Sequence, residues 1–195
     1  MARTAEIDRR TGETQVSLAL DLDGGDVDVS TGVGFFDHML STCARHGRLG
    51  LRVAASGDLE TGAHHTVEDV GIALGSGLDE ALGDRAGIRR FGHAATPMDE
   101  ALGVCAIDVS GRPLCLFRSD LPLTSIAGFE TELTEEFFRA VAANAKLTLH
   151  VGTAYGSNAH HMVEACFKAF ARALRDAVAI DPGESGVPST KGTLA

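Results

Sequence analysis

Two adjacent histidine pairs are the residues of this sequence best suited to chemistry. His64-His65 is followed by Glu68, and His160-His161 is followed by Glu164, so the pattern His-His-x-x-Glu occurs twice. On a helix with about 100° per residue, the glutamate lies about 40° from the first histidine and about 60° from the second, and either histidine can share a metal ion with it. The two histidines of a pair are about 100° apart and cannot easily bind the same ion. Each helix is therefore predicted to offer ligands to two ions.

Two further positions complete a predicted set of eight donors. His38 lies 26 residues before the first pair, and Glu136 lies 24 residues before the second pair. A pseudo-twofold arrangement would give each ion four protein ligands and leave room for water or substrate. Imidazole and carboxylate donors without a thiolate suit Mn²⁺, Fe²⁺ or Zn²⁺, and an octahedral preference favours Mn²⁺. A single motif of this kind could consist of polar residues on an exposed helix face that bind no metal, but its repetition at matched positions counts against that alternative.

The histidine pairs belong to an internal duplication with an offset of 96 residues, about half the chain. At the same offset, residues 51–55 match 147–151, and both segments alternate as strands do. Residues 18–24 also parallel 105–111, each a strand that ends in a turn. The sequence therefore predicts a tandem pair of α+β repeats, 1–92 and 93–180, followed by an extended or mobile tail at 181–195.

Each repeat is predicted to contain a short and a long helix. Apolar residues at spacings of three and four mark the short helices at 36–43 and 137–145, and Gly47 could end the first. The same spacing marks long helices at 63–81 and 159–178, which carry the histidine pairs. Ser157 or Asn158 is well placed as the N-cap of the last helix.

Composition excludes several classes of protein. The 195 residues are 44% hydrophobic and 23% charged, which is enough for a buried core. The net charge of −10 argues against nucleic-acid binding, and no apolar run approaches the ~18 residues of a membrane span. Residues 1–14 alternate charged and polar groups without an apolar stretch, so we expect no secretory signal there. Four cysteines without a C-x-x-C pair suggest buried thiols in a reducing compartment, so we expect a cytoplasmic protein.

Signals for phosphate binding are weaker. Arg90 follows a glycine-rich turn, Arg112 follows a strand end, and Ser189 and Lys191 share a small polar loop. Guanidinium, ammonium and hydroxyl groups suit phosphate oxygens. Each of these segments could equally be a solvated turn.

Six motifs in order give the chain a resemblance to the imidazoleglycerol-phosphate dehydratases. These motifs are residues 34–40 (GFFDHML), 64–69 (HHTVED), 90–92 with 97–100 (RFG, PMDE), 108–113 (DVSGRP), 160–164 (HHMVE) and 188–192 (PSTKG). They span nearly the whole chain. The resemblance implies two similar α+β halves of the ribosomal protein S5 domain 2-like type, each a four-stranded sheet with helices on one face. It also implies a homo-oligomer of 24 subunits, with two Mn²⁺ ions per subunit at subunit contacts.

The resemblance assigns roles by motif position. The metal ligands would be His38, His64, His65, Glu68, Glu136, His160, His161 and Glu164. The substrate contacts would be Glu13, His46, Arg90, Arg112, Ser189 and Lys191. Many members have histidine where this chain has Glu136, but a carboxylate still binds Mn²⁺ and the internal repeat independently selects that position.

The implied reaction removes water from imidazole glycerol phosphate to give imidazole acetol phosphate, in histidine biosynthesis. The hydrogen that is lost sits on a carbon that no carbonyl group acidifies. A cation on the ring nitrogen favours the imidazolate, whose electrons can expel hydroxide, and a carboxylate can then take the proton. Glu13 is our candidate for this base. Two alternatives stay open: a dinuclear metallohydrolase acting on a small phosphate ester, and a non-enzymatic assembly joined by metal ions.

Overall fold

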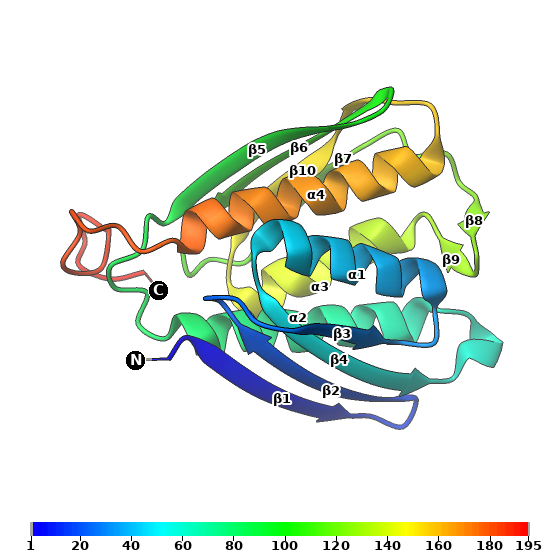
Figure 1. The fold of residues 1–195 in the computed structure, drawn as a ribbon, viewed down its shortest axis with the longest axis horizontal. Helices are drawn as coiled ribbons and strands as arrows, with labels where there is room; N and C mark the ends of the chain where they lie inside the picture. Colours follow the sequence, from blue (N-terminus) through cyan, green and yellow to red (C-terminus); the bar gives the residue numbers. More distant parts are fainter. Residues whose placement is uncertain (1, 195) are drawn as a thin grey trace.

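The computed structural model describes residues 2–194, in which two four-stranded sheets enclose four helices (Figure 1). The first sheet has the strand order β1-β2-β4-β3, with β3 parallel to β4 and the other pairs antiparallel. Buried residues alternate with exposed ones along β2 because one face packs on the helices. The strands of this sheet are β1 (Thr4–Arg10), β2 (Thr14–Asp21), β3 (Val27–Ser30) and β4 (Gly50–Gly57).

The second sheet repeats this topology, with the order β5-β6-β10-β7 and one parallel pair, β10 with β7. Its strands are β5 (Phe91–Met98), β6 (Ala101–Asp108), β7 (Leu114–Arg118) and β10 (Thr148–Tyr155). A small hairpin of β8 (Ser125–Ile126) and β9 (Phe129–Glu130) lies before the third helix. The predicted fold class, two similar α+β halves with helices on one face of each sheet, is confirmed.

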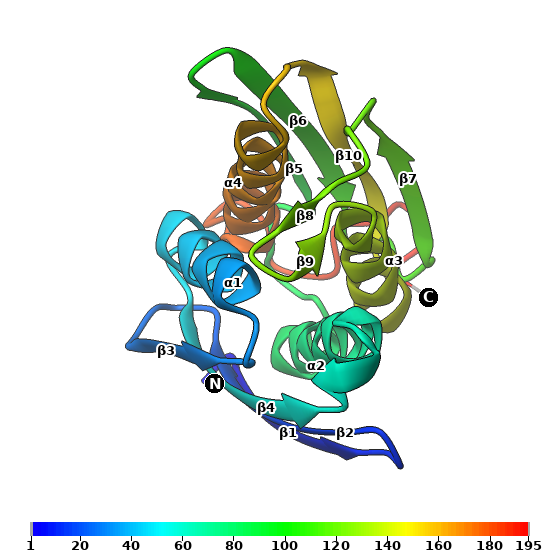
Figure 2. The ribbon, with the colours of Figure 1, turned by 90° about the vertical axis from the view of Figure 1, so that its right-hand side faces the viewer.

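The helices form the middle of the molecule, where α1 packs on α4 and α2 packs on α3 (Figure 2). They are α1 (Gly34–Gly47), α2 (His64–Leu82), α3 (Leu133–Ala145) and α4 (Ala159–Val178), and a single 3-10 turn, η1 (Leu59–Thr61), precedes α2. The first turns of all four helices lie at the same end of the molecule (Figure 1). None of the helices in the described chain is long and apolar enough to cross a membrane.

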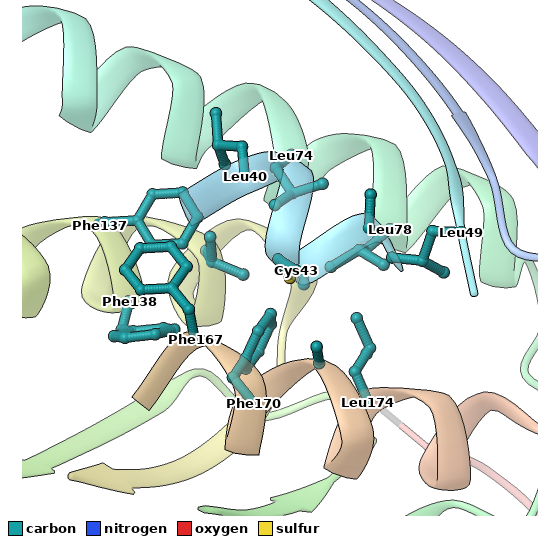
Figure 3. Packing of buried hydrophobic residues seen from close by; sticks show 14 of the residues in the cluster. Leu40, Cys43, Leu49, Leu74, Leu78, Phe137, Phe138, Phe167, Phe170 and Leu174 are labelled. Carbon is teal, nitrogen blue, oxygen red and sulfur yellow. The ribbon is translucent and has the colours of Figure 1, made fainter. Parts of the chain in front are cut away.

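The core lies between the helices and is rich in phenylalanine (Figure 3). Phe137 and Phe167 stack with ring centroids 5.1 Å apart, and Phe138 and Phe170 pack beside them. Cys43 lies in the same core and is buried, as are Cys105 and Cys166, whereas Cys115 is half-buried. All four thiols are free.

The register of the sheets corrects one predicted correspondence between the halves. Leu18 pairs with Val53, and its counterpart Cys105 pairs with Val151, so β4 and β10 correspond at an offset of 98. The predicted match of 51–55 with 147–151, at an offset of 96, is therefore wrong by two residues. The histidine pairs do lie 96 apart, because the link that contains η1 is longer than the link between β10 and α4.

Glycines in the second sheet allow α4 to approach β5 and β6 closely. A Cβ atom on Gly92 would lie 1.9 Å from the carbonyl oxygen of Ala173, and one on Gly103 would lie 2.2 Å from that of Ala165. Neither contact is possible for a real side chain, so both positions require glycine. This close packing fixes α4, and with it the second histidine pair, against the sheet.

Candidate active site

Two helices bring together the first group of predicted metal ligands. His38 comes from α1, and His160 and Glu164 come from α4. Nε2 of His160 lies 3.2 Å, and Nε2 of His38 3.4 Å, from Oε2 of Glu164. One ligand atom from each of these residues lies within 4.8 Å of the other two. Two imidazole nitrogens and a carboxylate oxygen at this spacing fit a divalent ion such as Mn²⁺, which accepts this mixture of donors.

The carboxylate of Glu164 is nearly buried and contacts three side chains. Its Oε1 lies 2.6 Å from Nζ of Lys168, one turn further along α4, while Oε2 faces the histidines. Burial raises the pKa of Glu164, but the hydrogen bond and charge of Lys168, together with the contacts of His38 and His160, leave the pKa below its ordinary value. Glu164 is therefore ionised at neutral pH, as a metal ligand must be.

The start of α4 also fixes the second histidine of its pair. The Asn158 side chain accepts hydrogen bonds from the backbone N–H groups of His160 and His161, which confirms Asn158 as the N-cap. Nδ1 of His161 lies 2.7 Å from Oε2 of Glu100, in the turn between β5 and β6. The hydrogen bond from His161 is the main reason that the pKa of Glu100 lies well below its ordinary range, and it raises the pKa of His161.

In the first half, the histidine pair meets a different set of carboxylates. Nε2 of His64 lies 4.0 Å from Oε2 of Glu68, one turn along α2. Nδ1 of His65 lies 3.1 Å from both oxygens of Asp58 and 3.8 Å from Oε2 of Glu13. The hydrogen bond to Asp58 raises the pKa of His65. Glu13 is largely exposed and lines an open groove of about 430 Å³ together with Asp58.

Glu136 occupies the position in α3 that His38 occupies in α1. Arg48 ends α1 and Lys146 ends α3, both in the left-handed conformation, which aligns the two helices at an offset of 98. Because α2 packs on α3 as α1 packs on α4, the match predicts that Glu136 faces α2 as His38 faces α4. Its half-buried side chain is not part of the group formed by His38, His160 and Glu164. Its role as a ligand stays a prediction.

The predicted phosphate contacts lie together, but far from the two histidine pairs. Arg90 donates to Asp108 at 2.7 Å and to the carbonyl oxygen of Pro188 at 2.9 Å, which ties the tail to the start of β5. Arg112 lies 3.8 Å from Asp108, and its mostly exposed side chain is free to meet an anion. Ser189 accepts a hydrogen bond from the backbone N–H of Lys191, so the two residues share one tight turn.

The predicted phosphate contacts and the second histidine pair lie at opposite ends of β5. Arg90 immediately precedes this strand, and Glu100, which contacts His161, follows it. Eight strand residues at about 3.3 Å each separate these ends by roughly 26 Å. Figure 1 shows the same separation, with the helix starts at one end of the molecule and the tail at the other.

His46, the remaining predicted contact, is half-buried in the last turn of α1. Burial lowers its pKa, and the positive charges of Lys168, Arg172 and Arg45 lower it further. A neutral imidazole beside three cations is compatible with binding an anion, because the surroundings are already positive.

Three residues around the site were not predicted from the sequence: Asp58, Glu100 and Lys168. Asp58 has no acidic counterpart, because the offset of 98 between β4 and β10 places Gly156 there. The offset of 87 between β2 and β6 matches Glu100 with Glu13, so the internal repeat could have revealed Glu100. Glu100 does lie in one of the six motifs, and its place in a two-residue turn beside a strand end could have marked it. Lys168 follows Glu164 by four residues, which is the spacing of a helical ion pair.

Comparison with known proteins identifies the family of this chain. The family model for imidazoleglycerol-phosphate dehydratase matches residues 31–174. The chain is 56% identical to the imidazoleglycerol-phosphate dehydratase of Acetivibrio thermocellus over 195 residues, which cover 100% of both chains. It is 57% identical to that of Symbiobacterium thermophilum over 193 residues, covering 98% of this chain and 93% of the relative.

Solved structures give the same result. The crystal structure of the Staphylococcus aureus enzyme matches with a TM-score of 0.84 and 40% identity, covering 91% of this chain and 99% of that one. The Pyrococcus furiosus protein, crystallised in complex with (S)-C348, matches with a TM-score of 0.84 and 36% identity, covering 96% and 100%. The chain therefore belongs to the imidazoleglycerol-phosphate dehydratase family of enzymes.

Proposed function

We propose that this chain removes water from imidazole glycerol phosphate to give imidazole acetol phosphate in histidine biosynthesis, with two Mn²⁺ ions per subunit. The observation that carries the proposal is the convergence of His38, His160 and Glu164 from two helices that are far apart in the sequence. Together with family membership, this group supports a carbon–oxygen lyase that binds the substrate through its imidazole ring.

The ligands of the two ions would be the eight residues that the repeat selects. His38, His160 and Glu164 would serve one ion, and the remaining donors would be His64, His65, Glu68, Glu136 and His161. Bound divalent ions would supply Lewis acidity that favours the ionised imidazole ring of the substrate. The ligand side chains would hold the imidazole ring of the substrate in one orientation.

Glu13 is the proposed base. Its carboxylate lies 3.8 Å from His65, in the open groove that also contains Asp58. Hydroxide leaves from the carbon attached to the ring, and Glu13 accepts the proton from the neighbouring carbon. The hydroxide and this proton together make one molecule of water. The resulting enol rearranges to the ketone, and the phosphate ester stays intact.

Arg90, Arg112, Ser189 and Lys191 would hold the phosphate group, and His46 would be a further substrate contact. The substrate is roughly 10 Å long by ordinary bond lengths, far shorter than the ~26 Å between the two ends of β5. One chain therefore cannot offer both its own metal ligands and its own phosphate contacts to one substrate molecule. This supports a homo-oligomer in which each site combines residues of different copies, and the family resemblance suggests 24 copies. A cytoplasmic location is proposed on the same resemblance.

The decisive experiment is anaerobic metal analysis together with a dehydration assay with and without added Mn²⁺. We expect two Mn²⁺ per chain and a ketone product that retains its phosphate. Release of free phosphate would instead favour the metallohydrolase, and bound metal without turnover would favour an assembly joined by ions.

The shared site has its own test. Arg112→Ala and His161→Ala should each be inactive alone. Dissociating and reassembling the two variants together should restore part of the activity, because some mixed sites then contain only native residues. No recovery from a verified mixed oligomer would contradict a site built from two copies.

A further inference from the structure

The second histidine of each pair is held at Nδ1 by a carboxylate that is not among the proposed ligands. For His161 this is Glu100, whose two oxygens have separate partners. Oε2 lies 2.7 Å from Nδ1 of His161, while Oε1 accepts the backbone N–H groups of Asn158 at 2.7 Å and Ser157 at 3.0 Å. The carboxylate is thus anchored to the start of α4 and cannot rotate without losing hydrogen bonds.

His65 has an equivalent partner from a different part of the fold. Both oxygens of Asp58 lie 3.1 Å from its Nδ1, and the Thr61 hydroxyl donates to Asp58 at 3.0 Å. Asp58 follows β4, whereas Glu100 lies between β5 and β6. The duplication does not relate Asp58 to Glu100. It matches Glu100 with Glu13, whose Oε2 lies 3.8 Å from the same Nδ1 of His65, so Asp58 is the nearer carboxylate in the first half.

The first histidines of the pairs are arranged differently. His64 and His160 face Glu68 and Glu164 through Nε2, so each of these histidines could share an ion with its glutamate. In His161 the Nε2 atom also points away from Glu100 and lies 3.6 Å from Asp99. Nε2 is therefore the nitrogen through which all four histidines can act as ligands.

A carboxylate can only accept a hydrogen bond, so the proton of a neutral His161 must reside on Nδ1. This leaves the lone pair on Nε2, where a ligand needs it. Partners of this kind change metal affinity by about 10- to 100-fold in metalloproteins. We propose that Glu100 and Asp58 are positioning residues that hold His161 and His65 in the Nδ1–H tautomer and orient their Nε2 atoms for metal binding. This inference rests on the proposed metal site.

Glu100→Gln separates the two tasks of this side chain. The glutamine oxygen can still accept from Ser157 and Asn158, so the start of α4 keeps its anchor. The amide nitrogen then faces Nδ1 of His161 and can only donate, which moves the imidazole proton to Nε2. The variant should fold and assemble as the native protein does, but carry the wrong tautomer at one histidine.

Two measurements test this. Nitrogen-15 NMR of the metal-free, histidine-labelled protein should show His161 changing from the Nδ1–H to the Nε2–H form in Glu100→Gln. Titration with Mn²⁺, followed by electron paramagnetic resonance, should show a loss of affinity of about 10- to 100-fold at one class of site. Glu80→Gln is the matched control, because this exposed residue lies at the far end of α2. It should change neither measurement.

An unchanged tautomer, or unchanged Mn²⁺ affinity, in a correctly assembled Glu100→Gln protein would overturn the inference. Asp58→Ala provides the second variant and should weaken the site to which His65 contributes. If the native protein bound no Mn²⁺, the proposed function would fail, whereas the tautomer measurement on the metal-free protein would still report on Glu100 separately.

Discussion

Lys168 and Glu164 form an ion pair at the edge of the helix layer, with Nζ 2.6 Å from Oε1, while the other oxygen of Glu164 faces His38 and His160. Both side chains are mostly buried. Lys168 therefore compensates the charge of a carboxylate that would otherwise have only the two histidines as partners when no metal ion is bound. A cation that binds beside Oε2 would take over part of this compensation.

Lys168→Met should for this reason destabilise the metal-free protein more than the metal-bound protein. Leaving a buried charged group unpaired costs roughly 1–3 kcal/mol or more, and added Mn²⁺ should recover part of the loss. Chemical unfolding with and without Mn²⁺ measures both effects. Lys146→Met is the control, since Lys146 forms an exposed pair with Asp79 worth at most about 1 kcal/mol. If Lys168→Met and Lys146→Met lost equal amounts of unfolding free energy, Lys168 would not be the charge partner of Glu164.

Glu136→Gln should weaken one of the two metal sites selectively. A neutral amide is a poorer ligand than a carboxylate for a hard divalent ion. The neighbouring Glu135→Gln is a matched control, because Glu135 pairs with Arg139 on the exposed surface of α3. Mn²⁺ titration of each variant should show two unequal classes of site for Glu136→Gln only. Equal weakening of both sites, or none, would count against Glu136 as a ligand.

Lys191→Ala should raise KM more than it lowers kcat. The proposed contact is with the phosphate group, which is far from the reacting carbons and is bound equally in the ground state and the transition state. Steady-state kinetics at saturating Mn²⁺ separates the two parameters. Thr190→Ala removes a neighbouring exposed side chain without a charge and should have little effect. A normal KM for Lys191→Ala would remove this residue from the phosphate site.

The cysteines should be unreactive in the folded protein at neutral pH. Burial raises the pKa of Cys43 and of Cys166 to about 12 and is the main reason that the pKa of Cys115 rises to about 11. Because thiolate is the reactive form, alkylation at pH 8 should be slow, and half-buried Cys115 should react first as the pH rises.

The same pKa values affect stability at high pH. A folded-state pKa above that of the unfolded thiol, about 8.5, means that the native state binds more protons at alkaline pH. The contribution of these thiols is therefore complete below about pH 8.5 and is lost as the pH rises toward 11 to 12. Mass spectrometry of alkylated peptides and unfolding at several pH values measure both effects. Alkylation of Cys43 at pH 8 as fast as in denatured protein would refute the prediction.

Much of this protein could be read from local patterns. The spacing of apolar residues placed all four helices, because a helix that buries one face must repeat its contacts every three or four residues. The offset between the histidine pairs indicated a duplicated α+β unit, and the polar Asn158 before the last helix marked its N-cap. The helix spacing and the N-cap depend on neighbours within a few residues, and the duplication follows from comparing two segments of the same chain, so the sequence alone determined these features.

Only the tertiary structure showed which residues meet across the fold. His38 lies beside Glu164 because α1 packs on α4, and Glu100 reaches His161 because a turn of the second sheet closes over the start of α4. The repeat matches Glu100 with Glu13, but it does not show that Glu100 contacts His161 whereas Asp58 takes the corresponding place beside His65. The length of β5 likewise separates the proposed metal ligands from the proposed phosphate contacts, and this distance depends on how the chain runs through the sheet and not on any motif.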